Sequence, residues 1–366
     1  MVLGRNRRRL TLVLTGLVTV ALVAAGAVTV SRLVSDDRST PTARATNPSP
    51  QPSPNPSTPP PGADITGPLN LLLVGVDTRV SVPDWEPHAD AVLMLHLPAG
   101  LSRAYLFSLP RDLVVDIPAS EPAGYPGGRT KLTHAMSYGS RVAGESKPDP
   151  AQGYELLRRT VSDYTKLPID AGAVLTFGGF DTLVDKLGGV NIRVDQRVVS
   201  RHRQPDGKHR EPGPGVGGYV GPQMVYEPGE AHLNGWQALD YARQRYLPGG
   251  DYARQRHHQQ LIRALIEKIL DEDLARQPER VEQVVRALDD TLLYVGGRRI
   301  VDFAYALGGL SPQALTLIGL PGASVGRGNA YRGEELTTIG RRFLTELRAG
   351  EVDTFLAERP ELIVPA

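Results

Sequence analysis

Acidic and basic side chains gather around three apolar runs in the first half of the chain. Asp77 directly follows the first run, Asp90 directly precedes the second, and Arg111 comes two residues after the third. If successive runs form antiparallel strands, these positions meet at one edge of the sheet, together with Arg79 and Asp112. Two such carboxylates fit a Mg²⁺ ion completed by substrate phosphates, and the guanidinium fork of arginine matches phosphate oxygens. The residue types predict a site for phosphate chemistry, with a solvated salt-bridge cluster as the alternative.

A second charged cluster lies at residues 241–260, whose sequence is YARQRYLPGGDYARQRHHQQ. Arg243 and Arg245 end one expected helix, before a Pro-Gly-Gly break. Three residues follow at helical spacings of three and four, on one face of the next helix: Asp251, Arg254 and His258. The free N–H groups and dipole of a helix N-terminus attract anions, so basic residues placed there reinforce an anion site. The alternative is an ordinary charged helix start exposed to solvent.

The elements that must position these clusters follow from hydrophobic patterning. The three apolar runs at residues 69–76, 91–97 and 103–109 are predicted strands, and a short turn joins the last two as an antiparallel hairpin. Further strands are expected at residues 190–194 and 315–320, and further helices at 153–164, 180–187, 278–293 and 300–307. This mixture predicts one α/β domain, residues 64–366, with helices flanking a mixed central sheet.

Two capping signals frame the second charged cluster. Asn234, followed three residues later by Gln237, has the pattern of a capping box, and the helix it opens is expected to run to about Tyr246. Asp251 is expected to cap a long helix with an apolar face. The charged cluster therefore lies where one helix ends and the next begins.

Residues 200–221 are rich in Gly, Pro, Arg and His, show no periodicity, and predict a mobile loop. Its His202 and His209 are interpreted as a flexible basic surface, with a metal or polyanion contact as the alternative. His96 lies in an apolar run and is interpreted as a core residue. No serine has convincing His and Asp partners for a catalytic triad, and no Cys/His spacing suggests zinc.

The N-terminal part of the chain predicts membrane anchoring. Residues 10–30 carry no charge and can cross a ~30 Å hydrocarbon core at ~1.5 Å per residue, as a signal-anchor helix. The preceding tail, residues 1–9, is rich in arginine and is therefore expected in the cytoplasm. Residues 31–63 form a Pro-rich segment that is expected to be disordered and to act as a spacer. A cleaved signal peptide is the alternative, and both interpretations place residues 64–366 outside the cell membrane.

Composition narrows the classes of function. The chain of 366 residues has no cysteine, which excludes disulfides and thiolate chemistry. Its formal net charge of +1 argues against a general polyanion binder, so no nucleic-acid partner is expected. Any anion site must be a local cluster of basic residues.

Seven ordered segments resemble the LytR-CpsA-Psr family of cell-wall assembly proteins over roughly residues 70–270. They are NLLLVGVDTR, HADAVLMLHL, LFSLPRDLVVDIP, RTKLTHAMSYG, FGGFDTLVDKLGGVNIRV, GEAHLNGWQALDYARQR and GDYARQR. The family also has a short cytoplasmic tail, one membrane helix and an outward domain. The resemblance therefore agrees with the topology expected from residues 1–63.

The resemblance implies a membrane-bound transferase of cell-wall biogenesis. Family members bind polyprenyl-pyrophosphate lipids, with the tail in an apolar pocket and the pyrophosphate in an arginine-rich mouth. They transfer a glycopolymer phosphate to a hydroxyl of peptidoglycan. Carried over to this sequence, the catalytic residues are Asp77, Asp90, Arg111, Arg243 and Asp251, with Asp77 and Asp90 at Mg²⁺ or Mn²⁺. The residues implied at the pyrophosphate are Arg79, His88, Arg111, Lys131, Arg243, Arg245, Arg254 and His258.

The sequence departs from the family pattern at three places. His88 stands where Arg is usual, Thr133 where Asn is usual, and His257-His258 where an Arg-Gln pair is usual. Because histidine is fully charged only below about pH 6.5, these changes suggest weakened or pH-dependent phosphate binding. Two alternatives to a transferase stay open: a lipid-binding scaffold without catalysis, and a hydrolase of pyrophosphate lipids.

Overall fold

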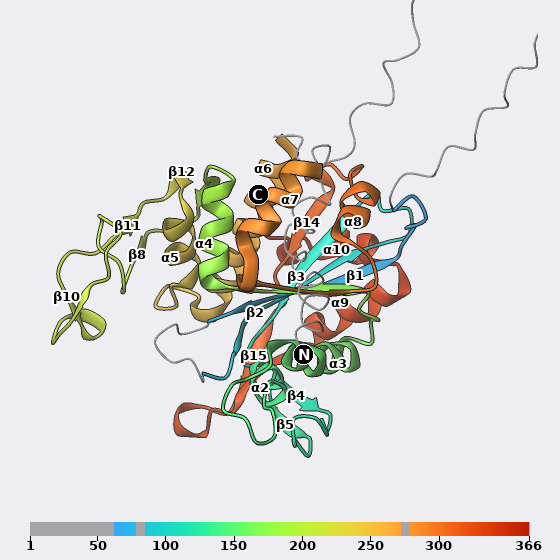
Figure 1. The fold of residues 1–366 in the computed structure, drawn as a ribbon, viewed down its shortest axis with the longest axis horizontal. Helices are drawn as coiled ribbons and strands as arrows, with labels where there is room; N and C mark the ends of the chain where they lie inside the picture. The colour runs from blue at the N-terminus through green and yellow to red at the C-terminus, as the bar shows by residue number, and fades with distance from the viewer. Residues whose placement is uncertain (1–61, 78–84, 272–277, 366) are drawn as a thin grey trace, which may run out of the picture.

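A six-stranded mixed sheet forms the centre of the protein (Figure 1). The computed structural model describes residues 62–77, 85–271 and 278–365. The strand order is β13-β6-β1-β2-β3-β14. The strands span Leu69–Val76 (β1), Ala89–Leu97 (β2), Ala104–Leu109 (β3), Ala171–Thr176 (β6), Leu292–Gly296 (β13) and Leu315–Ile318 (β14). Strands β1, β2 and β3 form an antiparallel meander, whereas β6 and β14 run parallel to β1 and β3.

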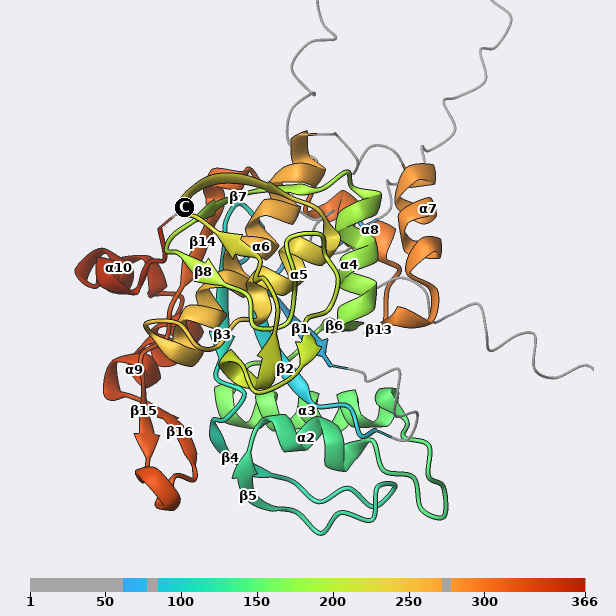
Figure 2. The same cartoon turned by 90° about the vertical axis from the view of Figure 1, so that its left-hand side faces the viewer.

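Both faces of the sheet are covered, which explains why its central strands are apolar along their whole length. On one face Leu71 and Leu93 pack with a group of helices: α4 (Phe177–Lys186), α5 (Gly235–Arg243), α6 (Gly250–Asp271), α7 (Pro278–Leu288) and α8 (Ile300–Ala306). On the other face Leu72 and Met94 pack with α2 (Thr133–Gly139), α3 (Pro150–Thr165), α9 (Thr338–Ala349) and α10 (Val352–Glu358). Figures 1 and 2 show these two helical layers on either side of the strands.

Outside the central sheet, the described residues form five two-stranded ribbons. They pair β4 (Val114–Ile117) with β5 (Gly128–Lys131), β7 (Val190–Val194) with β12 (Gly229–Leu233), β8 (Val198–Val199) with β11 (Val225–Tyr226), β9 (Glu211–Pro212) with β10 (Tyr219–Val220), and β15 (Gly322–Val325) with β16 (Gly333–Leu336). The segment carrying β8 to β11 projects beside α5 (yellow-green in Figure 1) and crosses in front of the helices in Figure 2.

The predicted α/β class and the β1–β2–β3 meander are confirmed. The capping box at Asn234 and Gln237 is present, although α5 ends at Arg243 instead of Tyr246. The prediction that Asp251 caps the long helix is wrong, because α6 begins at Gly250 and Asp251 lies in its first turn. The helix predicted at residues 278–293 ends at Leu288, and its last part belongs to strand β13.

The membrane predictions concern residues outside the described part of the chain. The cytoplasmic tail at residues 1–9, the anchor at 10–30 and nearly all of the linker at 31–63 lie there, as does Arg79. Among the described residues, no helix is both long and apolar enough to cross a bilayer.

Candidate active site

The edge of the sheet where the meander turns brings the first charged cluster together. Asp90, the second residue of β2, forms an ion pair with Arg111, which follows β3. Arg245 Nη2 lies 3.6 Å from the same carboxylate oxygen. The Asp90 residue is only 8% exposed, so two guanidinium groups offset the cost of burying its charge. The antiparallel topology anticipated from the sequence is the reason why Asp90 and Arg111 meet.

Asp77 joins this edge to the end of helix α5. Arg243 Nη2 lies 3.4 Å from Asp77 Oδ2, and its guanidinium carbon lies 4.8 Å from the centre of the Phe177 ring. The Arg243 side chain is held between a carboxylate and an aromatic face while remaining about one third exposed. It is therefore positioned before a ligand binds but can still reach one.

The first turns of α6 carry a buried cation. Arg254 is 3% exposed and forms an ion pair with Asp251, but its Nε has no hydrogen-bond partner. Burial lowers the pKa of Arg254 to about 10, despite the carboxylate beside it. One turn later, burial and the nearby Arg254 lower the pKa of His258 to about 3. A buried cation with an unused donor is poised to bind an anion that supplies the missing acceptor.

Two neighbouring cavities meet at these residues. The first, about 400 Å³, is polar, and six of the predicted site residues line it: Asp77, Asp90, Arg243, Arg245, Arg254 and His258. The second, about 70 Å³, lies between the sheet and the helices α4, α5 and α6, and apolar side chains such as Leu73, Leu93 and Ile262 line it. Both cavities are lined by Phe177, Arg243 and His258, so a single ligand could extend from one into the other.

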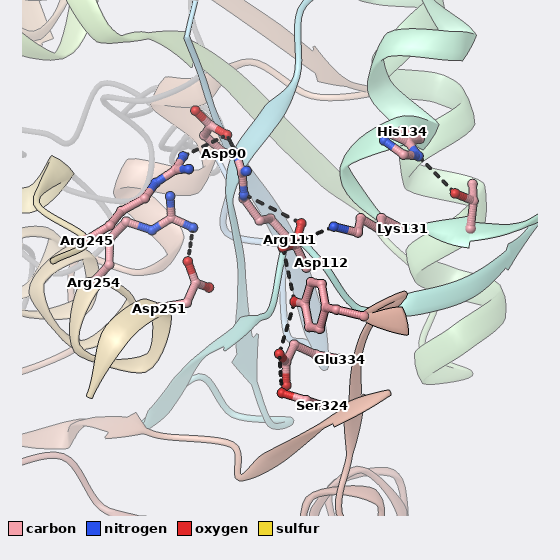
Figure 3. A network of polar contacts seen from close by, with 12 residues as sticks. Asp90, Arg111, Asp112, Lys131, His134, Arg245, Asp251, Arg254, Ser324 and Glu334 are labelled. Atoms are coloured by element: carbon pink, nitrogen blue, oxygen red, sulfur yellow. Dashed lines mark hydrogen bonds and ion pairs between the residues drawn. The ribbon is translucent and has the colours of Figure 1, made fainter. Parts of the chain in front are cut away.

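Other predicted residues lie around the polar cavity without lining it. Arg111 forms an ion pair with Asp90, which lines the cavity, and Asp251 forms one with Arg254, which also lines it. Lys131 Nζ lies 3.4 Å from Asp112 Oδ2, and the carboxylate of Asp112 is also 3.7 Å from Arg111 Nε. Figure 3 shows this chain of contacts from Asp90 to Lys131, with Arg245, Arg254 and Asp251 on the opposite side.

His88 lies apart from the arginines. Its Nδ1 is 2.9 Å from the backbone oxygen of Glu86, and its ring meets the His134 ring edge-on with centroids 6.3 Å apart. His88 thus neighbours His134 and lines neither cavity.

The two consecutive histidines of α6 have different environments. His257 is fully buried, its Nε2 is 3.1 Å from Asp195 Oδ1, and its ring stacks on Tyr241 at 4.2 Å. His258 faces both cavities. Its low pKa keeps the His258 imidazole neutral in the ligand-free site, so it would meet a phosphate as a hydrogen-bonding group and not as a cation. His257 is a packing residue, and only His258 can affect phosphate binding directly.

Sequence reasoning missed several residues that line the polar cavity. Arg201, Gly217 and Tyr219 come from the segment predicted to be a mobile loop, and Phe177 opens α4. His202, from the same segment, was considered only as a surface residue or a metal or polyanion contact. The sequence signal that could have pointed to them is the presence of basic and aromatic side chains in a glycine-rich loop. Their partners, however, are remote in sequence: Tyr246 lies 45 positions after Arg201, and Arg243 lies 66 positions after Phe177, so periodicity could not reveal the contacts.

The carboxylates present fit a divalent ion only in part. Asp77 and Asp90 both line the polar cavity, but each already contacts an arginine. No group of three or more Asp, Glu, His or Cys side chains suitable for a metal occurs among the described residues. Mg²⁺ commonly binds through one or two carboxylates and takes its other ligands from water and substrate phosphates. Asp77 and Asp90 are the ligand type that such a site would use, but the protein supplies no third ligand beside them among the described residues.

Comparison with known proteins shows the family of the chain. The LytR_cpsA_psr family model matches residues 29–331. Biofilm regulatory protein A of Streptococcus mutans is 28% identical over 223 residues, 60% of this chain and 48% of that protein. The polyisoprenyl-teichoic acid–peptidoglycan teichoic acid transferase TagU of Enterococcus faecalis is 26% identical over 226 residues, 62% of this chain and 60% of that protein. The matches span about half the length of these relatives.

The same fold occurs in a solved structure. The crystal structure of Bacillus subtilis TagV has a TM-score of 0.55 and 19% sequence identity, covering 78% of this chain and 97% of that one. At that identity the likeness concerns the fold, namely the mixed sheet and its helical layers.

Proposed function

Because the chain belongs to the LytR-CpsA-Psr family, we propose that it transfers a glycopolymer phosphate from a polyprenyl-pyrophosphate carrier to a hydroxyl of peptidoglycan. The observation that carries the proposal is the junction of an apolar cavity with an arginine-lined one at Arg243 and His258. A ligand with a hydrocarbon tail and a charged phosphate head matches both surfaces at once. The name of the Enterococcus faecalis relative, a polyisoprenyl-teichoic acid–peptidoglycan transferase, supports this substrate class.

The proposed reaction breaks one phosphoanhydride bond and forms one phosphodiester. The acceptor hydroxyl attacks the phosphorus that carries the glycan, the bond to the bridging oxygen breaks, and polyprenyl phosphate leaves. The hydroxyl proton is released to a carboxylate or to solvent. Because such transfer depends mainly on positioning and charge stabilisation, Arg243, Arg245 and Arg254 supply what this step needs.

A magnesium ion is part of the proposal. Asp77 and Asp90 would hold it, and it would supply positive charge to offset the negative charge of the reacting phosphates. Arg243 and Arg245 orient these carboxylates through the ion pairs already formed.

A location at the outer face of a cell membrane completes the proposed function. The uncharged segment at residues 10–30 and the Pro-rich segment after it support this placement. A flexible spacer would let residues 64–366 reach both a lipid headgroup and the peptidoglycan.

The test uses the full chain in detergent with a short-chain polyprenyl pyrophosphate that carries a glycan. Release of polyprenyl phosphate is measured with and without peptidoglycan fragments, and with and without Mg²⁺. We expect release that requires both, and loss of release in Asp77→Ala and Arg243→Ala. Release without acceptor would identify a hydrolase, and binding without release would identify a scaffold.

A further inference from the structure

The segment between β8 and β11 forms one wall of the polar cavity. Although the sequence predicts a mobile loop, residues 211–220 fold back as the ribbon β9–β10. Arg201, His202 and Tyr219 line the same cavity as Arg243 and Arg254. The cavity therefore has two basic sides, one from helices α5 and α6 and one from this segment.

A buried polar network fixes the start of the segment to α5. Ser200 Oγ donates to Asp240 Oδ1 over 2.9 Å, and Tyr226 Oη donates to Asp240 Oδ2 over 3.0 Å. Gln244 Nε2 donates to Asp240 Oδ1 over 2.9 Å, and Gln244 Oε1 accepts from the backbone N–H of Arg201 over 3.2 Å. Asp240 and Ser200 are 4% and 0% exposed. Since buried and satisfied networks resist rearrangement, Arg201 is held at a fixed place relative to the end of α5.

Arg210 ties the two arms of the segment together. It is 4% exposed, and its guanidinium donates to the backbone oxygen of Arg201 over 2.9 Å and to that of Tyr219 over 3.1 Å. A third bond reaches the oxygen of Gly221 over 3.3 Å. One buried side chain thus binds the backbone of both Arg201 and Tyr219, whose own side chains line the cavity. Arg210 is a positioning residue.

The side chains facing the cavity are pre-arranged. The guanidinium carbon of Arg201 lies 3.6 Å from the centre of the Tyr246 ring. A Cβ on Gly217, whose φ is +72°, would come within 2.3 Å of Arg201 Nε, so this glycine leaves the space that the guanidinium occupies. The ring of His202 meets that of Tyr219 edge-on, with centroids 5.3 Å apart. Burial and the neighbouring arginines lower the pKa of His202, which keeps its imidazole neutral.

We infer that Arg201, His202 and Tyr219 form a subsite for the first sugar of the lipid-linked glycan. This inference rests on the proposed function. The phosphates would contact Arg243, Arg245 and Arg254. The same cavity, about 400 Å³, extends from these arginines to Arg201, His202 and Tyr219. An aromatic face suits the C–H groups of a sugar ring, whereas a neutral imidazole and a fixed guanidinium hydrogen-bond to its hydroxyls. The subsite would add affinity for the sugar-bearing lipid and select among glycans.

The test compares two ligands of the full chain in detergent by calorimetry. One is geranylgeranyl pyrophosphate, and the other is the same lipid carrying a single sugar, chosen from glucose, galactose, N-acetylglucosamine and arabinose as the one bound most tightly. We expect the sugar to raise the affinity of the wild-type protein about tenfold or more, the effect of roughly 1.4 kcal/mol. Tyr219→Ala and Arg201→Ala should each remove most of that gain while leaving the affinity for geranylgeranyl pyrophosphate within about twofold.

Lys208→Ala is the matched control, because Lys208 belongs to the same segment, is largely exposed, and does not line the cavity. It should leave both affinities unchanged. The inference is overturned if no sugar raises the wild-type affinity, or if the cavity variants weaken both ligands equally, which would indicate a further phosphate site. Failure of the wild-type protein to bind geranylgeranyl pyrophosphate would instead overturn the proposed function and the inference with it. Melting temperatures distinguish a lost contact from a misfolded segment.

Discussion

Arg243 Nη2 and Asp77 Oδ2 lie 3.4 Å apart although 166 positions separate the two residues in the chain. The contact joins the end of strand β1 to the end of helix α5, at the boundary between the apolar and the polar cavity. A guanidinium at this boundary is where the charged head of a lipid would stop while its tail continues inward. We therefore expect the head group of a bound lipid to lie at this pair.

Replacing Arg243 by alanine should weaken binding of the head group without unfolding the protein. A charge-assisted hydrogen bond contributes about 1.5–3 kcal/mol, so the affinity for geranylgeranyl pyrophosphate should fall by about 10- to 100-fold. The side chain is about one third exposed, so the melting temperature should change little. Arg197→Ala, which removes an exposed partner of Glu227 outside both cavities, is the control and should bind normally. Equal affinities in Arg243→Ala and the wild-type protein would show that the head group lies elsewhere.

Replacing Arg254 by methionine should weaken lipid binding without lowering the stability of the folded protein. Arg254 is buried with an unpartnered Nε, so replacing it by an apolar side chain of similar volume removes the desolvation cost of a buried charge. Asp251, left without its partner, stays partly exposed in the first turn of α6, where the helix dipole favours an anion. We expect an unchanged or higher melting temperature together with at least a tenfold loss of affinity for geranylgeranyl pyrophosphate. A large fall in melting temperature would assign Arg254 a structural role.

His258 should make the folded state sensitive to acid. Its pKa is about 3 in the folded protein against 6.5 for an unperturbed histidine, so the unfolded chain takes up the proton first as the pH falls. The stability that depends on a neutral His258 is therefore complete above pH 6.5 and is lost progressively towards pH 3. His258→Gln should show a shallower fall of melting temperature over this range. His96, whose pKa burial lowers to about 4, acts in the same sense and should leave a residual slope in the variant. Parallel curves for the two proteins would contradict the assignment.

Filling the apolar cavity should block the lipid tail and spare the head-group site. Ala91 lines the apolar cavity opposite helices α4 to α6, and Ala91→Leu adds volume where the tail would lie. We expect at least a tenfold loss of affinity for geranylgeranyl pyrophosphate, while inorganic pyrophosphate binds as it does to the wild-type protein. Calorimetry with both ligands measures this difference. A parallel loss for inorganic pyrophosphate would mean that the substitution disturbs the arginines instead.

The sequence by itself determined the parts of the site that depend on local order. The apolar strands and the short turn between β2 and β3 specify an antiparallel meander, and that topology alone brings Asp90 next to Arg111. Helical spacing likewise puts Arg254 and His258 on one face of α6. These relationships follow from strand direction and helix periodicity, which neighbouring residues encode.

Only the tertiary structure decided which distant segments close around that edge. Strand β6 was not predicted, yet it pairs with β1 across about 100 positions and carries α4 and Phe177 to the cavity. The segment after β8 was predicted to be mobile, but Arg210 and the buried Asp240 hold it as a wall of the polar cavity. Such contacts depend on burial and on partners remote in sequence, because a hydrogen bond gains its full value only where water is excluded. Composition and periodicity report neither burial nor remote partners, so the second side of the site emerges only in the folded protein.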